Sequence, residues 1–240
     1  MTLRVLVLTT ETTHHAHFVN ELITAGHSVA VLNECITPAG DTLNARFLEQ
    51  RDAYEASRWF GDGVPFLADL CPTSDVPGIN TSQGLMALSQ EHADVALSFG
   101  TGWIRGEALG FLPFERWNLH GGDPQKYRGL DSHLWALYHR ESDALVTTLH
   151  TLDPDLDRGD IIAGSALDLR EAPELHMLRA ANTELAVSLV LGSLAHLDAV
   201  GRVPRMPQAG VGRYYSKLPS ALLETCATRY ATLTRQGMNR

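Results

Sequence analysis

The order of elements at the start of the chain constrains its fold most. Residues 3–8 are a continuous apolar run of the kind found in buried strands, and residues 18–26 repeat apolar side chains at helical spacing. Residues 28–32 are a second strand-like run, rich in β-branched side chains. A strand, a helix and a strand within about 30 residues form a βαβ unit, which requires a parallel sheet with helices on its faces. We therefore predict an α/β fold with a mostly parallel twisted sheet and helices on both faces.

The remaining chain continues this alternation of helices and strands. Helical spacing recurs in three segments, residues 43–60, 84–92 and 132–138. Strand-like runs recur in four segments, residues 94–99, 116–120, 144–152 and 160–169. An apolar stripe predicts one long helix packed across the sheet, with its leucines at Leu175, Leu178, Leu185, Leu189, Leu194 and Leu197. We expect one main domain over residues 1–203, with an insert at 34–77, and a small C-terminal helical appendage over residues 204–240.

Composition argues against several classes of function. The formal net charge of −9 disfavours a nucleic-acid surface, because phosphate binding needs clustered Lys and Arg. No stretch approaches the roughly 20 apolar residues of a membrane span, and residues 1–8 do not have the pattern of a signal peptide. Cys35, Cys71 and Cys226 are far apart, as is typical of reduced thiols. We predict a cytoplasmic protein with a small-molecule partner, no nucleic acid and no membrane; a homodimer is left open.

Asn118 and His120 are the first candidate site residues. They stand two positions apart on the predicted strand at residues 116–120, so both project from one face, about 6 to 7 Å apart along it. The strand then breaks at Gly121-Gly122, where a substrate can approach the backbone closely. Ligands of open parallel sheets bind at the carboxyl ends of strands, which favours a binding site here. The structural alternative is a capping asparagine and a histidine at the edge of the core.

A second polar segment supplies His150 on a strand and Asp157 on the following turn. An amide donor, a histidine and a carboxylate are the groups needed to move an acyl group onto an amine. Negative charge develops on the acyl oxygen as the amine attacks, and Asn118 with a protonated His120 can stabilise it. Asp157 can raise the pKa of His120 and help to take the amine proton. The alternatives are a turn-forming Asp157 and a core histidine at position 150.

Two segments carry possible metal ligands, but in neither do the residues have the spacing that a metal site needs. The aspartates at alternate positions of residues 153–157 are arranged as in a calcium loop. That motif needs glycine where Arg158 stands and a bidentate glutamate where Gly164 stands. The histidines of residues 14–17 lack the i, i+4 spacing that places two ligands on one helix face. We therefore predict no metal.

The motifs together resemble one known family. Asn118-x-His120, the run Tyr127-Arg128-Gly129, and the strand Thr148-x-His150 followed by Asp157-x-Gly159 are similar to the folate-dependent formyltransferases. These include glycinamide ribonucleotide, methionyl-tRNA and sugar N-formyltransferases. The resemblance covers residues 90–165 well and is weak after about residue 170. It implies a Rossmann-like fold with residues 1–203 as the catalytic domain. It also implies 10-formyltetrahydrofolate as co-substrate and transfer of its formyl group to a primary amine of a small molecule.

The resemblance also implies roles for individual residues. The implied catalytic set is Asn118, His120 and Asp157, with His150 in support. The implied folate-binding residues are Gly102, Trp103, Ile104, Arg105, Asp153, Asp155 and Leu156, of which the last three belong to a loop that closes the pocket. The candidate acceptor-binding residues are Thr10, His14, His15, Asp123, Tyr127 and Arg128.

This chain departs from the family pattern in two places. Gly121-Gly122-Asp123-Pro124 stands where the family usually has Ser-Leu-Leu-Pro, so Asp123 either binds a cationic acceptor or makes a turn with Pro124. Residues 9–15 lack the glycines that cradle a phosphate, which counts against glycinamide ribonucleotide as acceptor. The acidic chain also lacks the basic surface and second domain of a tRNA-binding member. An amino-sugar nucleotide or an amino-acid-derived metabolite suits these features.

Three alternatives differ in what the same residues would do. A 10-formyltetrahydrofolate hydrolase would use water as the acceptor, and the Asn-His-Asp set does not separate it from a transferase. A catalytically silent domain would bind folate or a protein partner on the same fold. A nucleotide-binding oxidoreductase is disfavoured, because no Gly-x-Gly-x-x-Gly follows the strand at residues 3–8.

Overall fold

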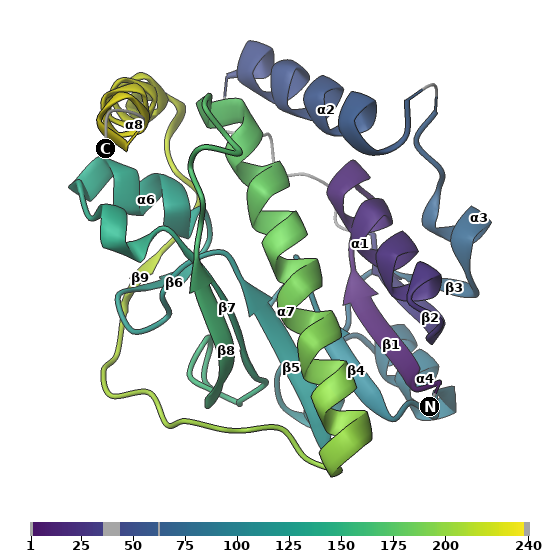
Figure 1. The fold of residues 1–240 in the computed structure, drawn as a ribbon. Helices are drawn as coiled ribbons and strands as arrows, with labels where there is room; N and C mark the ends of the chain where they lie inside the picture. The colour runs from purple at the N-terminus through teal and green to yellow at the C-terminus, as the bar shows by residue number, and fades with distance from the viewer. Residues whose placement is uncertain (1, 36–43, 62, 238–240) are drawn as a thin grey trace.

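A seven-stranded sheet forms the centre of the computed structural model, which describes residues 2–35, 44–61 and 63–237 (Figure 1). Its strand order is β3-β2-β1-β4-β5-β7-β8. The five parallel strands are β1 (Arg4–Thr9), β2 (Ser28–Glu34), β3 (Thr73–Val76), β4 (Val95–Ser98) and β5 (Glu115–His120). The two antiparallel strands are β7 (Val146–Thr151) and β8 (Ile161–Ala166). The structure confirms the predicted α/β fold with a mostly parallel sheet.

Helices cover both faces of the sheet because its central strands are apolar on both sides. Val5 and Val7 of β1 belong to a core cluster shared with α1 (Thr13–Thr24) and α7 (Leu178–Val200). Leu6 and Leu8 point the other way, into a cluster shared with α4 (Ser82–Gln90) and α5 (Glu107–Phe111). Successive side chains of a strand alternate between faces, so a continuous apolar run requires helices on each side.

Segment 34–77, predicted as an insert, contributes to the main sheet. Its strand β3 pairs with β2 and forms the edge of the sheet. The segment also contains α2 (Ala45–Trp59) and α3 (Leu67–Leu70). The helix predicted at residues 43–60 corresponds to α2, and residue 43 itself lies outside the described residues.

The C-terminal part of the chain packs against a small second layer. Strand β9 (Arg213–Tyr215) pairs in parallel with β6 (Tyr127–Gly129), and α8 (Leu223–Gly237) contacts α6 (Ser132–His139). The remaining elements are three 3-10 turns, η1 (Ser142–Ala144), η2 (Leu175–Met177) and η3 (Ser220–Leu222). The boundary between the main domain and the appendage stays a prediction.

The stretch Leu175–Val200 is long and apolar enough to cross a membrane by length and composition. The sequence-based expectation that no such stretch exists was therefore wrong. In the fold this stretch includes α7, which contacts α1, β7 and β8 across one face of the sheet (Figure 1). A helix packed across a sheet needs the same apolar side chains as a membrane span, so this composition is weak evidence for a membrane.

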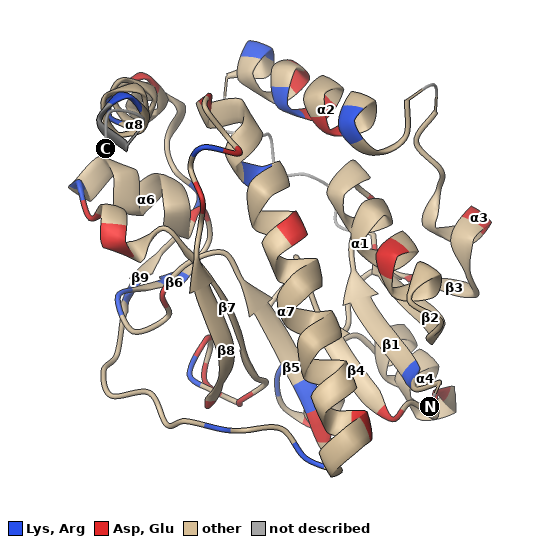
Figure 2. Ribbon diagram, in the orientation of Figure 1, with Lys and Arg blue, Asp and Glu red and all other residues tan. Residues whose placement is uncertain are grey.

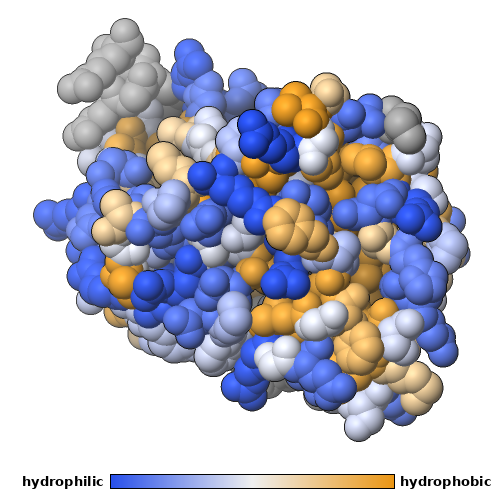
Figure 3. Space-filling view, turned by 90° about the horizontal axis from the view of Figure 1, so that it is seen from below, coloured by the Kyte–Doolittle hydropathy of each residue, from blue (hydrophilic) through white to orange (hydrophobic). Residues whose placement is uncertain are grey.

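Charged and apolar side chains are mixed on the surface. Acidic and basic residues alternate along α2, and both signs occur on α7 (Figure 2). The face seen from below in Figure 3 shows hydrophobic residues interspersed with hydrophilic ones. Exposed large hydrophobic side chains include Phe114, just before β5, and Val200, at the end of α7.

Candidate active site

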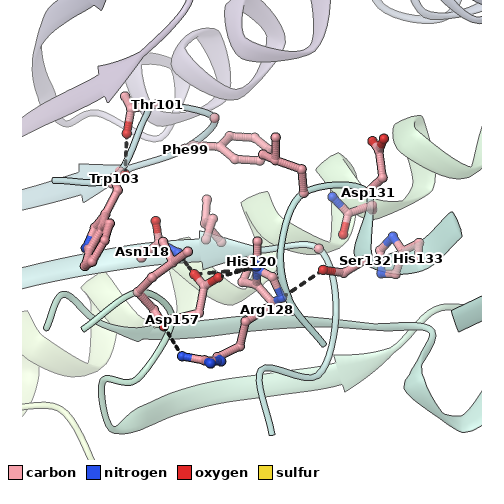
Figure 4. A pocket seen from close by; sticks show the side chains of 18 of the residues that line it. Phe99, Thr101, Trp103, Asn118, His120, Arg128, Asp131, Ser132, His133 and Asp157 are labelled. Atoms are coloured by element: carbon pink, nitrogen blue, oxygen red, sulfur yellow. Dashed lines mark hydrogen bonds and ion pairs between the residues drawn. The ribbon is translucent and has the colours of Figure 1, made fainter. Parts of the chain in front are cut away.

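A cavity of about 840 Å³ lies at the carboxyl ends of β4 and β5 (Figure 4). Residues 98–104, which follow β4, form one wall, and residues 118–121 at the end of β5 form another. The chain runs from β1 to β2 and β3 on one side of the sheet and to β4 and β5 on the other. Ligands of open α/β sheets bind where the strand order reverses in this way. The cavity is therefore at the edge of the sheet where the sequence places the site.

Asn118, His120, His150 and Asp157 converge at one wall of this cavity. His120 Nδ1 lies 3.7 Å from Asp157 Oδ1, and His150 Nε2 lies 3.6 Å from the same oxygen. Asn118 Nδ2 is 3.4 Å from that oxygen as well. The antiparallel register of β5 and β7 places Asn118 opposite His150, and the loop after β7 returns Asp157 to both. The structure thus brings together all four residues singled out from the sequence. Figure 4 shows three of them, Asn118, His120 and Asp157.

The turn that carries Asp157 is fixed from several directions. Its φ of 53° lies in the left-handed region, which Asp tolerates better than most residues. The backbone N–H of Gly129 donates to Asp157 Oδ2 at 2.8 Å, and the Gln208 side chain donates to the carbonyls of Asp157 and Gly159. A Cβ at Gly159 would lie 1.7 Å from the carbonyl oxygen of Thr151, so only glycine fits there. Asp157 is both a turn residue and a cavity residue.

The carboxylate of Asp157 is ionised although its side chain is buried. Burial works against the charged form, but the positive charges of His120 and His150 in acid and the Gly129 N–H together lower the pKa of Asp157 to about 2. A negative charge therefore stands beside the two histidines at neutral pH.

The ring of His120 is neutral at neutral pH. Burial lowers the pKa of His120, and the opposing effect of Asp157 is smaller. The protonated ring expected from the sequence is thus corrected by the structure, because desolvation outweighs the nearby carboxylate. His120 Nε2 lies 2.9 Å from the carbonyl oxygen of Tyr127, which can only accept, so Nε2 carries the proton. The lone pair of Nδ1 faces Asp157 Oδ1.

The amide of Asn118 is held by His150. His150 Nδ1–H donates to the carbonyl of Thr151 at 2.9 Å, which leaves Nε2 as an acceptor. Asn118 Nδ2 donates to that acceptor at 3.1 Å. Its other hydrogen points toward Asp157 Oδ1 at the longer distance of 3.4 Å, so an incoming oxygen could replace this contact at small cost.

The predicted folate-binding loop forms a second wall. Gly102, Trp103 and Ile104 line the cavity, whereas Arg105 does not and instead places its guanidinium over the Trp103 ring. The expectation that Arg105 lines this pocket is therefore corrected. The Trp103 indole N–H donates to the carbonyl of Pro154 at 3.1 Å and joins this wall to the opposite loop.

The opposite loop contributes the remaining predicted residues. Asp153, Asp155 and Leu156 line the cavity together with Leu152. The Asp153 side chain accepts from the backbone N–H of Asp155 at 2.9 Å, which shapes the loop as a tight turn.

Two residues that fix the loop after β4 were missed by the sequence analysis. The buried carboxylate of Glu34, at the end of β2, accepts from the backbone N–H groups of Gly102 at 2.6 Å and Ile79 at 3.1 Å. The Asn80 side chain donates to the Trp103 carbonyl and accepts from the backbone N–H of Arg105. A carboxylate two positions after the buried strand at residues 28–32 was the available signal for Glu34.

Comparison with known proteins agrees with this geometry. No family model matches the chain. The methionyl-tRNA formyltransferase of Methylacidiphilum infernorum is 28% identical over 140 residues, a match that spans 58% of this chain and 43% of that relative. Over these residues the chain is similar in sequence to a formyltransferase. Because the match spans less than half of that protein, its tRNA substrate is not assigned here.

Solved structures share the fold of this chain. HypX from Aquifex aeolicus, in complex with tetrahydrofolic acid, superposes with a TM-score of 0.59 at 16% identity, covering 96% of this chain and 34% of HypX. A sugar N-formyltransferase from a Shewanella species gives a TM-score of 0.61 at 12% identity, covering 89% of this chain and 76% of the other. At such identities the likeness confirms the fold and leaves the substrate open.

Three candidate acceptor residues do not line the cavity. Thr10 lies in the turn between β1 and α1, and His14 and His15 lie in the first turn of α1. His15 Nδ1–H donates to the Thr10 carbonyl at 2.8 Å, and its ring fills the space beside Gly100. Burial lowers the pKa of His15 to about 3 and that of His14 well below its usual value. These side chains hold the turn and the loop after β4, and the acceptor role predicted for them stays a prediction without support from the cavity.

Asp123 and Tyr127 also serve the framework. Asp123 Oδ1 accepts from the backbone N–H of Gln125 at 2.9 Å, as expected for the turn-forming alternative. The Tyr127 ring stacks on Tyr215, and its carbonyl fixes His120. Neither side chain lines the cavity, so their acceptor role also stays a prediction without support from the cavity.

Arg128 lines the cavity, and two of its side-chain nitrogens donate to backbone carbonyls. Its Nε donates to the Gly212 carbonyl at 2.8 Å and its Nη1 to the Leu156 carbonyl at 3.3 Å. These bonds tie the loop before Asp157 to the C-terminal segment. Arg128 is thus the one predicted acceptor residue on the cavity wall.

The remaining wall comes from helices that the sequence analysis did not connect to the site. Its members lie on α2, on α6 and around the start of α7: Phe47, Arg51, Ser132, His133, Leu175, Leu178, Arg179 and Asn182. Ser132 Oγ lies 3.3 Å from His120 Nε2. Within residues 2–35, 44–61 and 63–237, no group of three His, Cys, Asp or Glu side chains is placed to hold a metal ion.

Proposed function

We propose that this protein is an N-formyltransferase that moves a formyl group from 10-formyltetrahydrofolate to a primary amine of a small molecule. The observation that carries the proposal is the convergence of an amide, a neutral imidazole and an ionised carboxylate at one cavity wall. Asp157 Oδ1 lies 3.4 Å from Asn118 Nδ2 and 3.7 Å from His120 Nδ1. The relatedness to a methionyl-tRNA formyltransferase supports the same reaction class.

The walls of the cavity suit a folate. Trp103 and the backbone of Gly102 and Ile104 offer an aromatic surface and amide groups to a flat, polar ring. Leu152 and Leu156 supply apolar surface on the opposite side. We assign these residues to the folate, in line with the tetrahydrofolic acid bound by HypX.

The catalytic residues fit the attack of an amine on the formyl carbon. A bond forms between the amine nitrogen and that carbon, and negative charge develops on the formyl oxygen. The second N–H of Asn118 stabilises this charge. Nδ1 of the neutral His120 takes a proton from the amine, and Asp157 stabilises the imidazolium that results. The bond between the formyl carbon and the folate nitrogen then breaks, and that nitrogen receives the proton from His120.

Mass spectrometry of candidate amines incubated with 10-formyltetrahydrofolate tests the proposal. The panel contains amino-sugar nucleotides and amino-acid-derived amines, and the expected result is a gain of one formyl group. Formate release that is independent of any amine would indicate the hydrolase. Folate binding without turnover would indicate a silent binding domain.

Two variants test the assignment of the site. We expect Asn118→Ala and His120→Ala each to lower turnover by about 10²-fold or more. Folate binding, followed by Trp103 fluorescence, is expected to be largely kept. Near-normal rates in both variants would remove these residues from the mechanism.

A further inference from the structure

Two arginines line the cavity on the wall formed by helices. Arg51 lies on α2, and Arg179 lies in the first turn of α7. Figure 2 shows basic residues on α2 and near the start of α7, where these helices approach each other. The reaction proposed above gives neither arginine a role.

The two arginines differ in how their charge is balanced. Arg179 donates from Nε and Nη2 to the buried carboxylate of Glu55 at 2.7 and 2.6 Å, so it is neutralised where it stands. Asp52 bridges the pair, accepting from Arg179 Nη2 at 2.8 Å and from Arg51 Nε at 3.0 Å. Asp52 is half exposed to solvent, which screens its charge.

Arg51 keeps unused donors at the cavity wall. Its side chain is only 17% exposed, and its two terminal nitrogens donate to no group in the part of the chain that the structure describes. A guanidinium presents its terminal N–H groups in a planar fork that matches a carboxylate or phosphate. Burial and the charge of Arg179 lower the pKa of Arg51, and an anion at this point would offset both effects.

The acidic loop after β7 and the arginines Arg51 and Arg179 lie on different walls of the cavity. Three of the cavity's acidic residues, Asp153, Asp155 and Asp157, lie on the loop after β7 beside Arg128, a fourth, Asp131, lies just before α6, and Arg51 and Arg179 lie on the wall formed by α2 and α7. A molecule with an amine at one end and an acid group at the other would bind in one orientation, with its amine at Asp157.

We propose that Arg51, positioned by Asp52 and Arg179, binds an anionic group of the acceptor. The group is a phosphate or a carboxylate, which the guanidinium fork recognises alike. This inference rests on the proposed function and narrows the acceptor to a primary amine that also carries an acid group. Binding of that group would hold the amine beside Asn118 and His120.

Calorimetric titration of the folded protein with inorganic pyrophosphate and with acetate tests the anion subsite. Arg51→Gln removes the charge, Arg51→Lys keeps it without the fork, and Arg46→Gln makes the same charge change on the exposed part of α2. We expect Arg51→Gln to weaken anion binding about tenfold or more, which corresponds to about 1.4 kcal/mol. Arg51→Lys should keep part of the affinity, and Arg46→Gln should match the wild type. The tighter of the two anions identifies the acid group.

Equal anion affinities in the wild type and Arg51→Gln, or no anion binding by the wild type, would overturn the inference. Circular dichroism shows whether Arg51→Gln is folded, and Arg51→Lys provides a second reading if it is not. These titrations need neither folate nor turnover. Arg51-dependent anion binding without any formyl transfer would therefore contradict the proposed function alone.

Discussion

Replacing Asp157 with asparagine removes the negative charge beside His120 while keeping most of the local shape. The amide oxygen can still accept from the Gly129 N–H, which lies 2.8 Å from the carboxylate in the wild type. The amide NH₂ can donate to the lone pair on Nδ1 of the neutral His120. The resting site should therefore survive, and the loss should appear when the ring becomes positive.

The distances set the size of this loss. In the proposed step the imidazolium of His120 faces Asp157 Oδ1 at 3.7 Å. A charge pair at this separation is worth about 4 kcal/mol at an effective dielectric constant of about 20. Each 1.36 kcal/mol or so of barrier changes the rate about tenfold. We therefore expect Asp157→Asn to lower the rate of the chemical step by about 10²- to 10³-fold.

Stability should fall by a smaller amount with a defined pH dependence. Burial raises the pKa of Asp157, but a protonated His120 and the Gly129 N–H lower it from 3.8 to about 2, and the neutral ring at pH 7 does not supply that charge. A carboxylate with a lowered pKa contributes stability above its unfolded pKa and loses it as the pH falls toward about 2. Asp157→Asn should thus change the unfolding temperature little at pH 7, and the loss should grow as acid protonates His120 and vanish toward about pH 2.

Single-turnover formyl transfer at saturating folate and amine measures the chemical step, and calorimetry measures unfolding. Asp168→Asn is the matched control, because it makes the same change in a surface pair with Arg170. A transfer rate within about threefold of the wild type would refute the electrostatic role of Asp157. A variant that fails to fold would show that the carboxylate mainly serves the turn.

Three further predictions address the ionisation of His120, the folate loop and the turn. Because burial lowers the pKa of His120 from 6.5, kcat/KM should be flat near pH 7 and fall as the pH drops through that lowered value; a rise on acidification would contradict a neutral base. Glu34→Gln should raise the KM for formyl-folate about tenfold with kcat kept, because one acceptor facing Gly102 or Ile79 becomes a donor; an unchanged KM would count against this clamp. Gly159→Ala should lower the free energy of unfolding by about 1–3 kcal/mol in urea titrations, and an unchanged midpoint would show that the turn relaxes freely.

Local periodicity was enough to predict the sheet and part of the site. The apolar run at residues 3–8 and the βαβ order dictate a parallel sheet covered on both faces. Asn118 and His120 had to share a face because strand side chains alternate with a period of two. That Asp157 lies close to Asn118 and His120 was a hypothesis from the sequence. The pairing of β5 with β7 and the distances to Asp157 Oδ1 confirm that the three residues are close together.

Tertiary packing decided what no local pattern encodes. His14 and His15 are adjacent to the end of β1 in sequence, yet the fold buries them behind the loop at Gly100. The neutral state of His120 follows from its burial, which depends on every element packed around it. Arg51 and Arg179 are far apart in the sequence and share a wall only because α2 packs against η2, the 3-10 turn that directly precedes α7. The sequence by itself determined the strands, the helices and the side chains presented by each strand, because these depend on near neighbours; the charge states and the far wall of the cavity depend on contacts between distant segments, which only the folded chain supplies.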